Sequence, residues 1–510
     1  MHIYQTSAIR EMDRLAGARL DGTYELMWRA ALALANCAED YADDCGCDSF
    51  LVLAGHGNNG GDALLTARNL AMRGHEVHMH LVTSRDRLRG DALKAWQEIQ
   101  DDLHDYHNFF FFEEEIPSPE VLKTPHMLVL DGLLGTGING VPQEPYASWI
   151  RLLQDCRQPI MSLDIPSGLN ADTGEAELSV TADLTATLAA PKAGMFLRQG
   201  PEQCGRLRVL DIGIPADIRD AQPAWQTEDG LSPEGFSFAE ATTLLSREPF
   251  TTYKNQRGHL LVVGGSREYS GAPLLTAEAA LRAGAGLVTL ALPESCNPMA
   301  TLPRSVMVRK FSTVNDLLPL AEGKSALAIG PGLGLSDFAA EVVAELLRLD
   351  IPTALDADGL NLLAKNPQWL ESHRQALLLT PHSGEYRRLV QGFLGESSAP
   401  NDFSCDLAKA TGATVLLKGC RSQISAPDGR LSLNLSGAPS LATAGSGDVL
   451  TGICGAFLAN GLPPYDSARL GCFLHGLAGE LAAPCGSRGS IADDLPGLLP
   501  EVFRRFFPRN

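Results

Sequence analysis

The sequence has no long hydrophobic run and no excess of positively charged residues. These two absences argue against several classes of protein and partner. Nowhere do about eighteen apolar residues follow one another, which is the length that a membrane-spanning helix requires. The 41 Lys and Arg residues are outnumbered by 61 Asp and Glu residues, so the formal net charge is -20. Nucleic acids and anionic membranes are bound through clustered Lys and Arg, and the composition therefore argues against both as partners. Small phosphorylated ligands remain possible, because backbone N–H groups and helix N-termini bind them.

The sequence also lacks a targeting segment and a disulfide framework. Its start, MHIYQTSAIREMDR, carries charges and has no apolar stretch of the kind found in secretion signals. The 11 cysteines are odd in number and scattered along 510 residues. Only Cys37, Cys45 and Cys47 lie together, and no second Cys or His pair completes a zinc site around them. We therefore expect a cytoplasmic protein with free thiols.

Short apolar runs that end in Gly, Asp or Asn alternate with segments of helical period along the chain. Examples are SFLVLAGHGNNGGD, HMLVLDGLLGTG and PIMSLDIPSG. This pattern is typical of successive βα units around a mostly parallel sheet, in which ligands bind beyond the carboxyl ends of the strands. The length, together with a stretch near Gly230 that is rich in Pro, Gly and acidic residues, predicts two α/β domains at 1–220 and 241–510, joined by a linker at 221–240.

Polar residues follow three strand ends in the first domain. In GHGNNGGD, Gly55 to Asp62, glycines let the backbone approach a ligand, and the N-terminus of the helix that follows would bind an anion. Asp131 and Ser167 follow two further strands, and with Asn59 they present the oxygen ligands that hard cations prefer. Equally, Asp131 and Ser167 could only cap the next helix or turn.

The segment AGSGDVLTG, Ala444 to Gly452, carries the strongest single signal of the second domain. The N–H groups of Gly445 and Gly447 at the start of a helix would form an anion hole for a transferring phosphoryl group. Asp448 could take the proton of a substrate hydroxyl as that hydroxyl attacks phosphorus. A Gly-rich turn in which Asp448 only caps its helix is the alternative. The small residues on both sides of the motif leave room for a ligand and favour the first interpretation.

The ordered series GNNGGD, LDGLLGTGINGVPQEPY, LDIPSGLNADTG and ATLAAPKAGMFLRQGPEQCGRLRVLDIGIP resembles the NAD(P)H-hydrate epimerase family across residues 1–220. The resemblance implies a Rossmann-like, three-layer α/β/α fold and a potassium ion held by Asn59, Asp131 and Ser167. Ala63 stands where the family often has another Gly, which alters the loop but removes no polar contact. The resemblance further implies that the hydrated nicotinamide is bound by Asn58, Asn59, Gly60, Gly61, Asp62, Gly135, Thr136, Gly137, Ile138, Asn139, Gly140, Val141 and Asp164.

Asp164 is the candidate acid/base of this domain. The reaction is inversion at C6 of the hydrated ring, by reversible loss of the C6 hydroxyl or by ring opening, and either route needs a carboxyl group that moves a proton. Asp164 follows a predicted strand and so lies in the cleft, where burial favours the protonated carboxyl. The other possibility is that Asp164 only holds the hydroxyl of the substrate.

The motif AGSGD resembles the ribokinase-like superfamily, and further segments are similar to its NAD(P)H-hydrate dehydratase branch over residues 240–500. These segments are YKNQRGHLLVVGGSREYSGAPLLTAEAALRAGAGLVTLA, GPGLG, DADGLNLLA, TPHSGEYRRL and LLKGC. A ribokinase-like α/β fold is implied, with hydrated cofactor bound by Gly271, Ala272, Gly334, His382 and Asp448. An adenine nucleotide would be held by Lys418, Gly419, Cys420, Arg421, Ser422, Gly445, Ser446 and Gly447. Ser383 replaces the usual Pro of the motif around His382 and leaves that histidine in place.

Together the resemblances imply a bifunctional enzyme of nicotinamide nucleotide repair. Its isomerase domain would interconvert the R and S hydrates of NADH and NADPH, called NADHX and NADPHX. Its lyase domain would phosphorylate the C6 hydroxyl of the S form with Asp448 as base and then eliminate phosphate. Fused domains of this kind resemble prokaryotic members that use ADP, with magnesium on the nucleotide, although the residues themselves do not distinguish ADP from ATP.

Two other functions are compatible with parts of the sequence. The second domain could be a small-molecule kinase, because GSGD would serve any substrate alcohol. The first domain could only bind a ligand or assemble subunits, but GNNGGD, Asp131 and Asp164 would then be unexplained. The amphipathic segment TSAIREMDRLAGARLDGTYELMWRAALALANCAE favours a homo-oligomer, although it could also pack on its own domain.

Overall fold

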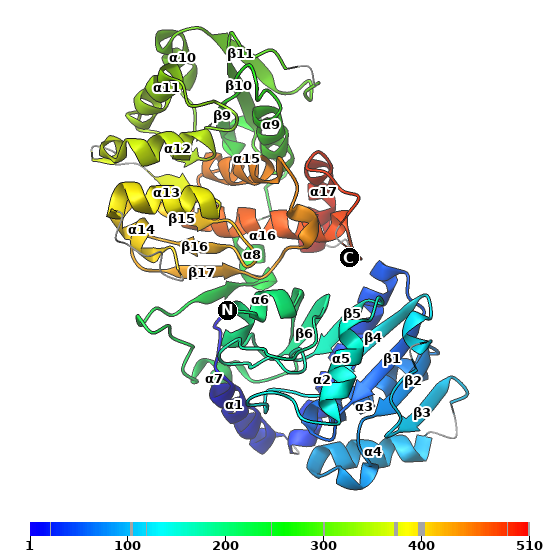
Figure 1. Cartoon of the computed structure of the whole chain (residues 1–510). Helices are drawn as coiled ribbons and strands as arrows, with labels where there is room; N and C mark the ends of the chain where they lie inside the picture. The colour runs from blue at the N-terminus through cyan, green and yellow to red at the C-terminus, as the bar shows by residue number, and fades with distance from the viewer. Residues whose placement is uncertain are drawn as a thin grey trace. The chain divides into compact units, whose positions relative to one another are not determined.

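The computed structural model describes residues 1–507 apart from positions 21, 103–105, 119, 246, 299–300, 372–375, 396–402 and 487. The chain divides into two compact units, Met1–Thr227 and Glu228–Asn510, and each is built around its own sheet (Figure 1). The predicted α/β class is therefore confirmed. Among the described residues, no helix combines the length and the apolar character needed to cross a bilayer.

The first unit has seven parallel strands in the order β3-β2-β1-β4-β5-β6-β7. Their bounds are Ser49–Ala54 (β1), Glu76–Leu81 (β2), Phe109–Glu113 (β3), Met127–Gly132 (β4), Ile160–Leu163 (β5), Leu184–Leu188 (β6) and Arg206–Leu210 (β7). The order reverses between β1 and β4, since β2 and β3 lie on one side of β1 and the later strands on the other. Ligands of open α/β sheets bind at the carboxyl edge beside such a reversal.

Helices cover both faces of this sheet, which confirms the predicted three-layer arrangement. One face is covered by α2 (Thr23–Cys45), α3 (Asn58–Met72) and α4 (Gly90–Asp102), and the other by α5 (Tyr146–Gln154). The amphipathic α1 (Thr6–Arg19) packs on its own unit, against α2 and α7 (Ala216–Asp220), and buries Met12 fully. Shorter elements are α6 (Gly200–Gln203) and the 3-10 turns Arg85–Arg87, Val121–Lys123 and Ala193–Phe196.

The second unit has ten strands in the order β11-β10-β9-β12-β13-β14-β15-β16-β17-β8. Their bounds are Glu234–Phe236 (β8), His259–Val263 (β9), Leu287–Pro293 (β10), Met307–Phe311 (β11), Ala326–Ile329 (β12), Thr353–Leu355 (β13), Leu377–Leu379 (β14), Thr414–Leu417 (β15), Gln423–Ser425 (β16) and Leu431–Asn434 (β17). The strands from β11 to β15 are parallel, whereas β16 is antiparallel to both of its neighbours.

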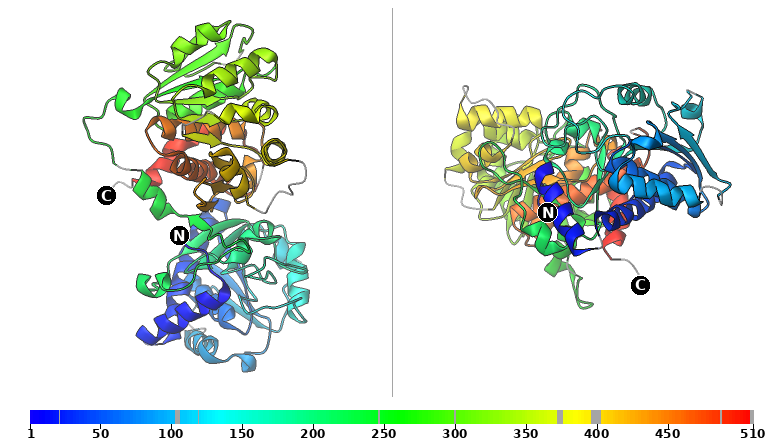
Figure 2. Two further views of the ribbon diagram at one scale, coloured as in Figure 1. Left: turned by 90° about the vertical axis from the view of Figure 1, so that its left-hand side faces the viewer. Right: turned by 90° about the horizontal axis from the view of Figure 1, so that it is seen from below.

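This sheet too lies between two layers of helices (Figure 2). One layer contains α9 (Ala272–Arg282), α15 (Ser446–Ala459), α16 (Pro464–Ala482) and α17 (Asp494–Phe506). The other contains α10 (Val314–Ala321), α11 (Asp337–Leu347), α12 (Asp358–Lys365), α13 (Ser383–Leu394) and α14 (Cys405–Thr411). α9 and α15 pack closely, because a Cβ on Gly452 would lie only 2.2 Å from the carbonyl oxygen of Thr276. The 3-10 turns are Lys254–Arg257, Pro367–Leu370 and Pro439–Leu441.

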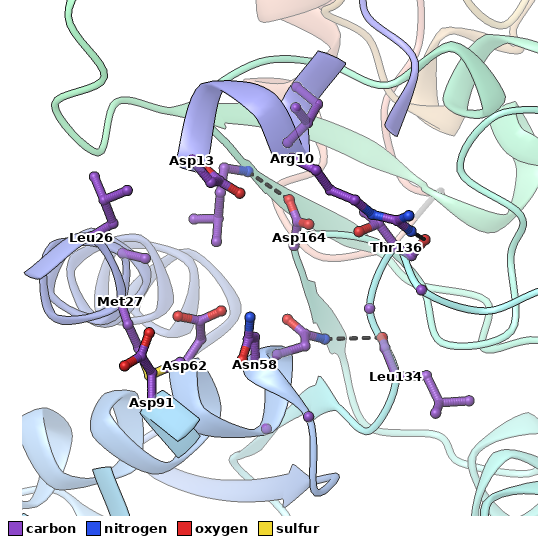
Figure 3. A pocket seen from close by; sticks show the side chains of 18 of the residues that line it. Arg10, Asp13, Leu26, Met27, Asn58, Asp62, Asp91, Leu134, Thr136 and Asp164 are labelled. Carbon is purple, nitrogen blue, oxygen red and sulfur yellow. Dashed lines mark hydrogen bonds between the residues drawn. The ribbon is translucent and has the colours of Figure 1, made fainter. Parts of the chain in front are cut away.

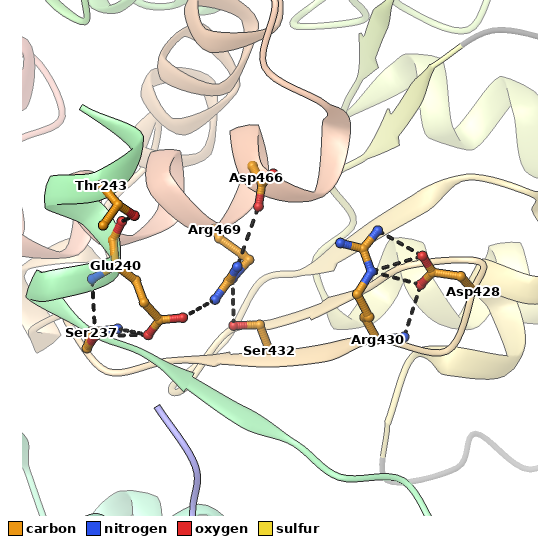
Figure 4. Close-up of polar contacts among 8 residues, drawn as sticks. All are labelled: Ser237, Glu240, Thr243, Asp428, Arg430, Ser432, Asp466 and Arg469. Carbon is orange, nitrogen blue, oxygen red and sulfur yellow. Dashed lines mark hydrogen bonds and ion pairs between the residues drawn. The ribbon is translucent and has the colours of Figure 1, made fainter. Parts of the chain in front are cut away.

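Part of the predicted linker, 221–240, is folded into the second unit. Its last residues form β8, which pairs with β17, and the start of α8 (Phe238–Leu244). Arg469 of α16 holds this segment, because its guanidinium lies 2.5 Å from the carboxylate of Glu240 (Figure 4). The guanidinium also lies 4.5 Å from the ring centre of Phe236. A three-residue strand is too short to show an alternating pattern, so the sequence carries no signal for it.

Replacing Arg469 should destabilise the second unit more than replacing an exposed arginine. The Arg469 side chain is 12% exposed. Arg469→Ala should lower the free energy of unfolding by about 2 kcal/mol, because it removes the ion pair with Glu240 and the cation–π contact with Phe236. In the control Arg504→Ala, the arginine side chain is 74% exposed and its ion pair is with Glu501, so the loss should be at most about 1 kcal/mol. Urea denaturation measures both variants. Equal losses would contradict the proposed role of Arg469.

Candidate active sites

The first candidate site is a cavity of about 640 Å³ at the carboxyl edge of the seven-stranded sheet (Figure 3). Of the residues predicted from sequence, its lining includes Asn58, Asn59, Gly60, Asp62, Gly135, Thr136, Gly137, Ile138 and Asp164. Gly61 and residues 139–141 lie outside the lining, and Asp131 and Ser167 are fully buried behind it. The α1 residues Arg10 and Asp13 also line the cavity, and sequence reasoning missed them.

Two glycines shape the turn that leads from β1 into α3. A Cβ on Gly60 would lie 1.9 Å from the carbonyl oxygen of Gly55, and a Cβ on Gly55 would lie 1.9 Å from the carbonyl oxygen of Leu133. Both distances are far shorter than van der Waals contact, so the turn requires glycine at these positions. The tight turn places the first N–H groups of α3 against the cavity, where they can bind an anion.

Asn59, Asp131 and Ser167 form a buried cluster of oxygen atoms behind the cavity wall. Asp131 Oδ1 accepts a hydrogen bond from the Ser167 hydroxyl at 2.5 Å. Burial raises the pKa of Asp131, although the hydrogen bonds that its carboxylate accepts from Ser167, Ser162 and Leu133 oppose this shift. The Asn59 amide donates to the carbonyl oxygen of Leu134 at 3.0 Å. Asn59 Oδ1 is buried and has no hydrogen-bond partner among the described residues. An unpartnered buried oxygen is costly unless water or a cation binds it, so this oxygen-rich cluster fits a hard cation.

Asp164 is held by a buried lysine. Its backbone is left-handed, with φ 66°, which Asp tolerates better than most residues. Its Oδ1 accepts hydrogen bonds from Lys192 Nζ, from the Thr187 hydroxyl at 3.3 Å and from the Leu188 N–H at 2.9 Å. Lys192 is fully buried. The structure therefore adds to Asp164 a neighbouring cation that the sequence argument, based on burial alone, did not include.

Two further carboxyl groups, those of Asp13 and Asp62, line the same cavity. Burial, reinforced by the charge of Asp164 and opposed by Lys192, raises the pKa of Asp13 to about 6. Burial, followed by the charges of Asp164 and Asp13, raises the pKa of Asp62 well above its usual range. The cavity therefore contains two carboxyl groups with raised pKa values beside one that is paired with a cation.

The second candidate site is the start of α15. Gly445 precedes this helix with φ 91°, a conformation that favours glycine, and Asp448 lies in the first turn. Burial and the charge of Asp356 raise the pKa of Asp448 to about 7, while Lys418 opposes the shift. A Cβ on Gly447 would lie 3.2 Å from Lys418 Nζ, so the ammonium group lies against the helix start. A helix N-terminus with an ammonium beside it is suited to binding phosphate.

Asp356, at the end of β13, connects the parts of this site. Its Oδ1 accepts a hydrogen bond from Lys418 Nζ at 2.7 Å, and its Oδ2 accepts one from the Thr451 hydroxyl at 2.5 Å. Burial alone would lower the pKa of Lys418, but the charges of Asp356 and Glu385 raise it. The sequence analysis missed Asp356, although two carboxylates after a strand, in DADG, are a signal for such a role.

Three further segments bring predicted residues to this second site, at Gly271, Gly334 and His382. Gly271 precedes α9, and Thr276 of that helix donates to the backbone carbonyl of Asp448 at 3.0 Å, which joins the starts of α9 and α15. The N–H of Gly334 donates to Asp358 at 2.8 Å. His382 caps α13 and forms a β-bridge with Lys418, so the two lie side by side.

Hydrogen bonds hold the predicted nucleotide loop and Ser446 in place. Residues 418–422 turn after β15, and the Ser422 hydroxyl closes this turn on the Gly419 carbonyl at 3.0 Å. Cys420 is exposed. Ser446 Oγ lies 3.2 Å from Nε2 of His475, a buried residue that the sequence analysis did not identify. Burial lowers the pKa of His475 to about 4, so its ring is neutral at pH 7.

Comparisons with known proteins assign both halves of the chain. A family model described as YjeF-related protein N-terminus matches residues 23–194, and one described as NAD(P)H-hydrate dehydratase matches residues 260–500. The bifunctional NAD(P)H-hydrate repair enzyme Nnr of Coxiella burnetii is 35% identical over 503 residues, covering 97% of each chain. The protein of the same name from Moorella thermoacetica is 34% identical and covers 99% of this chain and 97% of its own.

One solved structure bears on the fold of the second unit. A ribokinase-like superfamily protein from Enterococcus faecalis superposes with a TM-score of 0.50 at 24% identity, covering 56% of this chain and 99% of its own. The predicted ribokinase-like fold is confirmed by this likeness.

Proposed function

Because this chain belongs to the family of bifunctional NAD(P)H-hydrate repair enzymes, we propose that its first unit is the NAD(P)H-hydrate epimerase and its second unit the dehydratase. The family predicted from the sequence is confirmed. The protein is an enzyme that epimerises NADHX and NADPHX and dehydrates their S forms to NADH and NADPH. Support for the assignment comes from the cavity around Asp164 in one unit and the helix start with Asp448 in the other.

Dehydration needs a better leaving group than hydroxide, and the second unit can supply one. We propose that Asp448 takes the proton of the C6 hydroxyl while that oxygen attacks the terminal phosphorus of ADP, so that AMP leaves. Inorganic phosphate then leaves C6, and loss of a proton from C5 restores the C5–C6 double bond. The N–H groups around Gly445 to Gly447 and the ammonium of Lys418 stabilise the negative charge of the transferring group.

The ligands of the second unit follow from the charges at this site. The nucleotide would be held by the turn at residues 418–422 and by residues 445–447, and the hydrated cofactor by Gly271, Ala272, Gly334 and His382. A magnesium ion bound to ADP fits, because the carboxylate of Asp356 lies beside Lys418 and would attract a further cation. Magnesium would supply charge neutralisation of the nucleotide phosphates.

In the first unit, we propose that Asn59, Asp131 and Ser167 hold a potassium ion and that Asp164 contacts the C6 hydroxyl. The unpartnered oxygen of Asn59 supports the cation site. A potassium ion would fix the start of α3 and the loop after β4 in the arrangement that binds substrate. The residues that line the cavity from 58–62 and 135–138, extended by 139–141, would bind the hydrated nicotinamide. A cytoplasmic location and a homo-oligomer remain predictions.

The two activities are tested with separate hydrates. The full chain with ADP and magnesium should convert S-NADHX to NADH, seen as recovery of NADH absorbance, and should also consume R-NADHX at a rate limited by epimerisation. Asp164→Ala should abolish consumption of the R form alone. Failure to consume either hydrate with any nucleotide would refute the proposed function. Formation of a stable phosphorylated product would identify a kinase, and consumption of the S form alone would leave the first unit a binding module.

The dehydratase should depend on an ionised Asp448. Asp448→Asn should reduce consumption of S-NADHX at least about a hundredfold, because a general base contributes that much. In the wild type, the rate should fall as the pH drops below about 7, since Asp448 then gains the proton that prevents it from acting as a base. Asp428→Asn, an exposed carboxylate of the same unit, is the control and should keep the wild-type rate. A rate for Asp448→Asn within threefold of wild type would contradict this role.

The cation site is tested by melting temperature. Potassium chloride in place of choline chloride should raise the melting temperature of the wild type by about 2–5 °C, because a ligand that binds only the folded state stabilises it. Asn59→Ala should remove this difference, whereas Asn58→Ala, next to it on α3, should keep it. An unchanged potassium effect in Asn59→Ala would contradict the site.

A further inference from the structure

Inversion at C6 needs one group that gives a proton to the departing oxygen and one that takes a proton from the entering oxygen. Asp164 is suited only to the second task. Its Oδ1 already accepts hydrogen bonds from Lys192, Thr187 and Leu188, so the ammonium group of Lys192 holds this carboxylate in place as an acceptor. Its Oδ2 has no hydrogen-bond partner among the described residues, so that oxygen is available to the substrate. A separate proton donor is therefore required.

Asp13 has the surroundings of such a donor. It lies on α1, lines the cavity and has no hydrogen-bond partner among the described residues. A largely buried carboxyl group without a partner is costly as an anion, and it becomes stable when it holds a proton or meets a ligand. In Figure 3, Asp13 lies next to Asp164 on one side of the cavity, and Asp62 lies on the opposite side, on α3.

We propose that Asp13 is the proton donor of the epimerase cavity and that it works with Asp164, which Lys192 holds as the proton acceptor. Lys192 is in this scheme a positioning residue, because it acts through Asp164. The proposal rests on the epimerase function proposed above and adds to it a residue from α1.

The proton movements balance over one inversion. The C6–O bond breaks, its electron pair stays on oxygen, and the oxygen takes the proton of Asp13 and leaves as water. The lone pair of the ring nitrogen N1 forms the N1=C6 bond. The planar ring then turns its other face toward the two neighbouring carboxyl groups, and water adds to C6 from that face. The N1=C6 electron pair returns to N1, and the proton of the added water passes to Asp164. Transfer of that proton from Asp164 to Asp13 restores the starting state.

The charges around Asp13 favour it over Asp62 for this role. The groups that face Asp13 are Asp164 and Lys192 from the sheet edge and Asp62 from α3, with Arg10 one turn earlier on α1. Burial, together with these charges, raises the pKa of Asp13 to about 6, where a carboxyl group can both give and regain a proton near neutral pH. Burial and the charges of Asp164 and Asp13 raise the pKa of Asp62 well above its usual range, which favours its protonated form as the donor of a hydrogen bond.

Three carboxyl-to-amide variants of the full chain test the proposal, with R-NADHX, S-NADHX, ADP and magnesium. Asp13→Asn should lower consumption of R-NADHX at least about a hundredfold and leave consumption of S-NADHX unchanged. Asp62→Asn should lose less, because an amide still donates a hydrogen bond. Glu11→Gln, on the same helix but paired with Arg14 on the surface, should match the wild type. An Asp13→Asn rate within threefold of wild type, or a larger loss in Asp62→Asn than in Asp13→Asn, would overturn the proposal.

The pH profile separates a proton donor from a structural residue. Wild-type consumption of R-NADHX should fall as the pH rises above about 6, since Asp13 then loses its proton, and Asp13→Asn should be slow at every pH. Should Asp13→Asn also lose activity on S-NADHX, Asp13→Glu decides, because it should regain consumption of the R form if the carboxyl group is what matters. A glutamate that restores only the S activity would refute the donor role. A wild type that consumes S-NADHX but never R-NADHX would instead refute the epimerase function itself.

Discussion

A lysine paired with an aspartate at the carboxyl end of a strand sets the charge arrangement of both sites. In the first unit the pair is Lys192 with Asp164, and in the second it is Lys418 with Asp356. Removing two charges from water is costly, and the pair is stable only because each charge has its partner and further hydrogen bonds. Thr187 and Leu188 supply these bonds to Asp164, and Thr451 supplies one to Asp356.

One cation among several carboxyl groups leaves the others to hold protons. Asp13 and Asp62 have raised pKa values in the first unit, as Asp448 and Glu385 have in the second, and burial is the first cause in each case. The same arrangement then serves different chemistry. In the first unit the paired aspartate faces the cavity, whereas in the second the paired lysine lies against the helix start, where phosphate would bind.

Site residues that belong to local motifs could be predicted from the sequence. Site residues whose position depends on tertiary packing could not. Strand ends and Gly-rich turns are local, so GNNGGD, Asp131, Asp164 and AGSGD could be identified as parts of sites. The roles of those residues stay predictions. Asp13 could not be placed in the cavity, because its position there depends on the packing of α1 against α2, far from Asp164 in the chain. Nothing in AAPKAG indicates that Lys192 is fully buried, since lysines in loops are usually exposed.

The two Lys–Asp ion pairs contribute both to the stability of each unit and to the chemistry of its site. Loss of either partner leaves a buried charge without its counter-ion, which typically costs about 3–5 kcal/mol, a large part of the stability of a domain. A neutral replacement of Lys192 would also remove a positive charge that lowers the pKa values of Asp13 and Asp62, so both values would rise together. The charges of Asp13, Asp62, Asp164 and Lys192 therefore depend on one another. The salt bridge between Lys192 and Asp164 joins two members of this group.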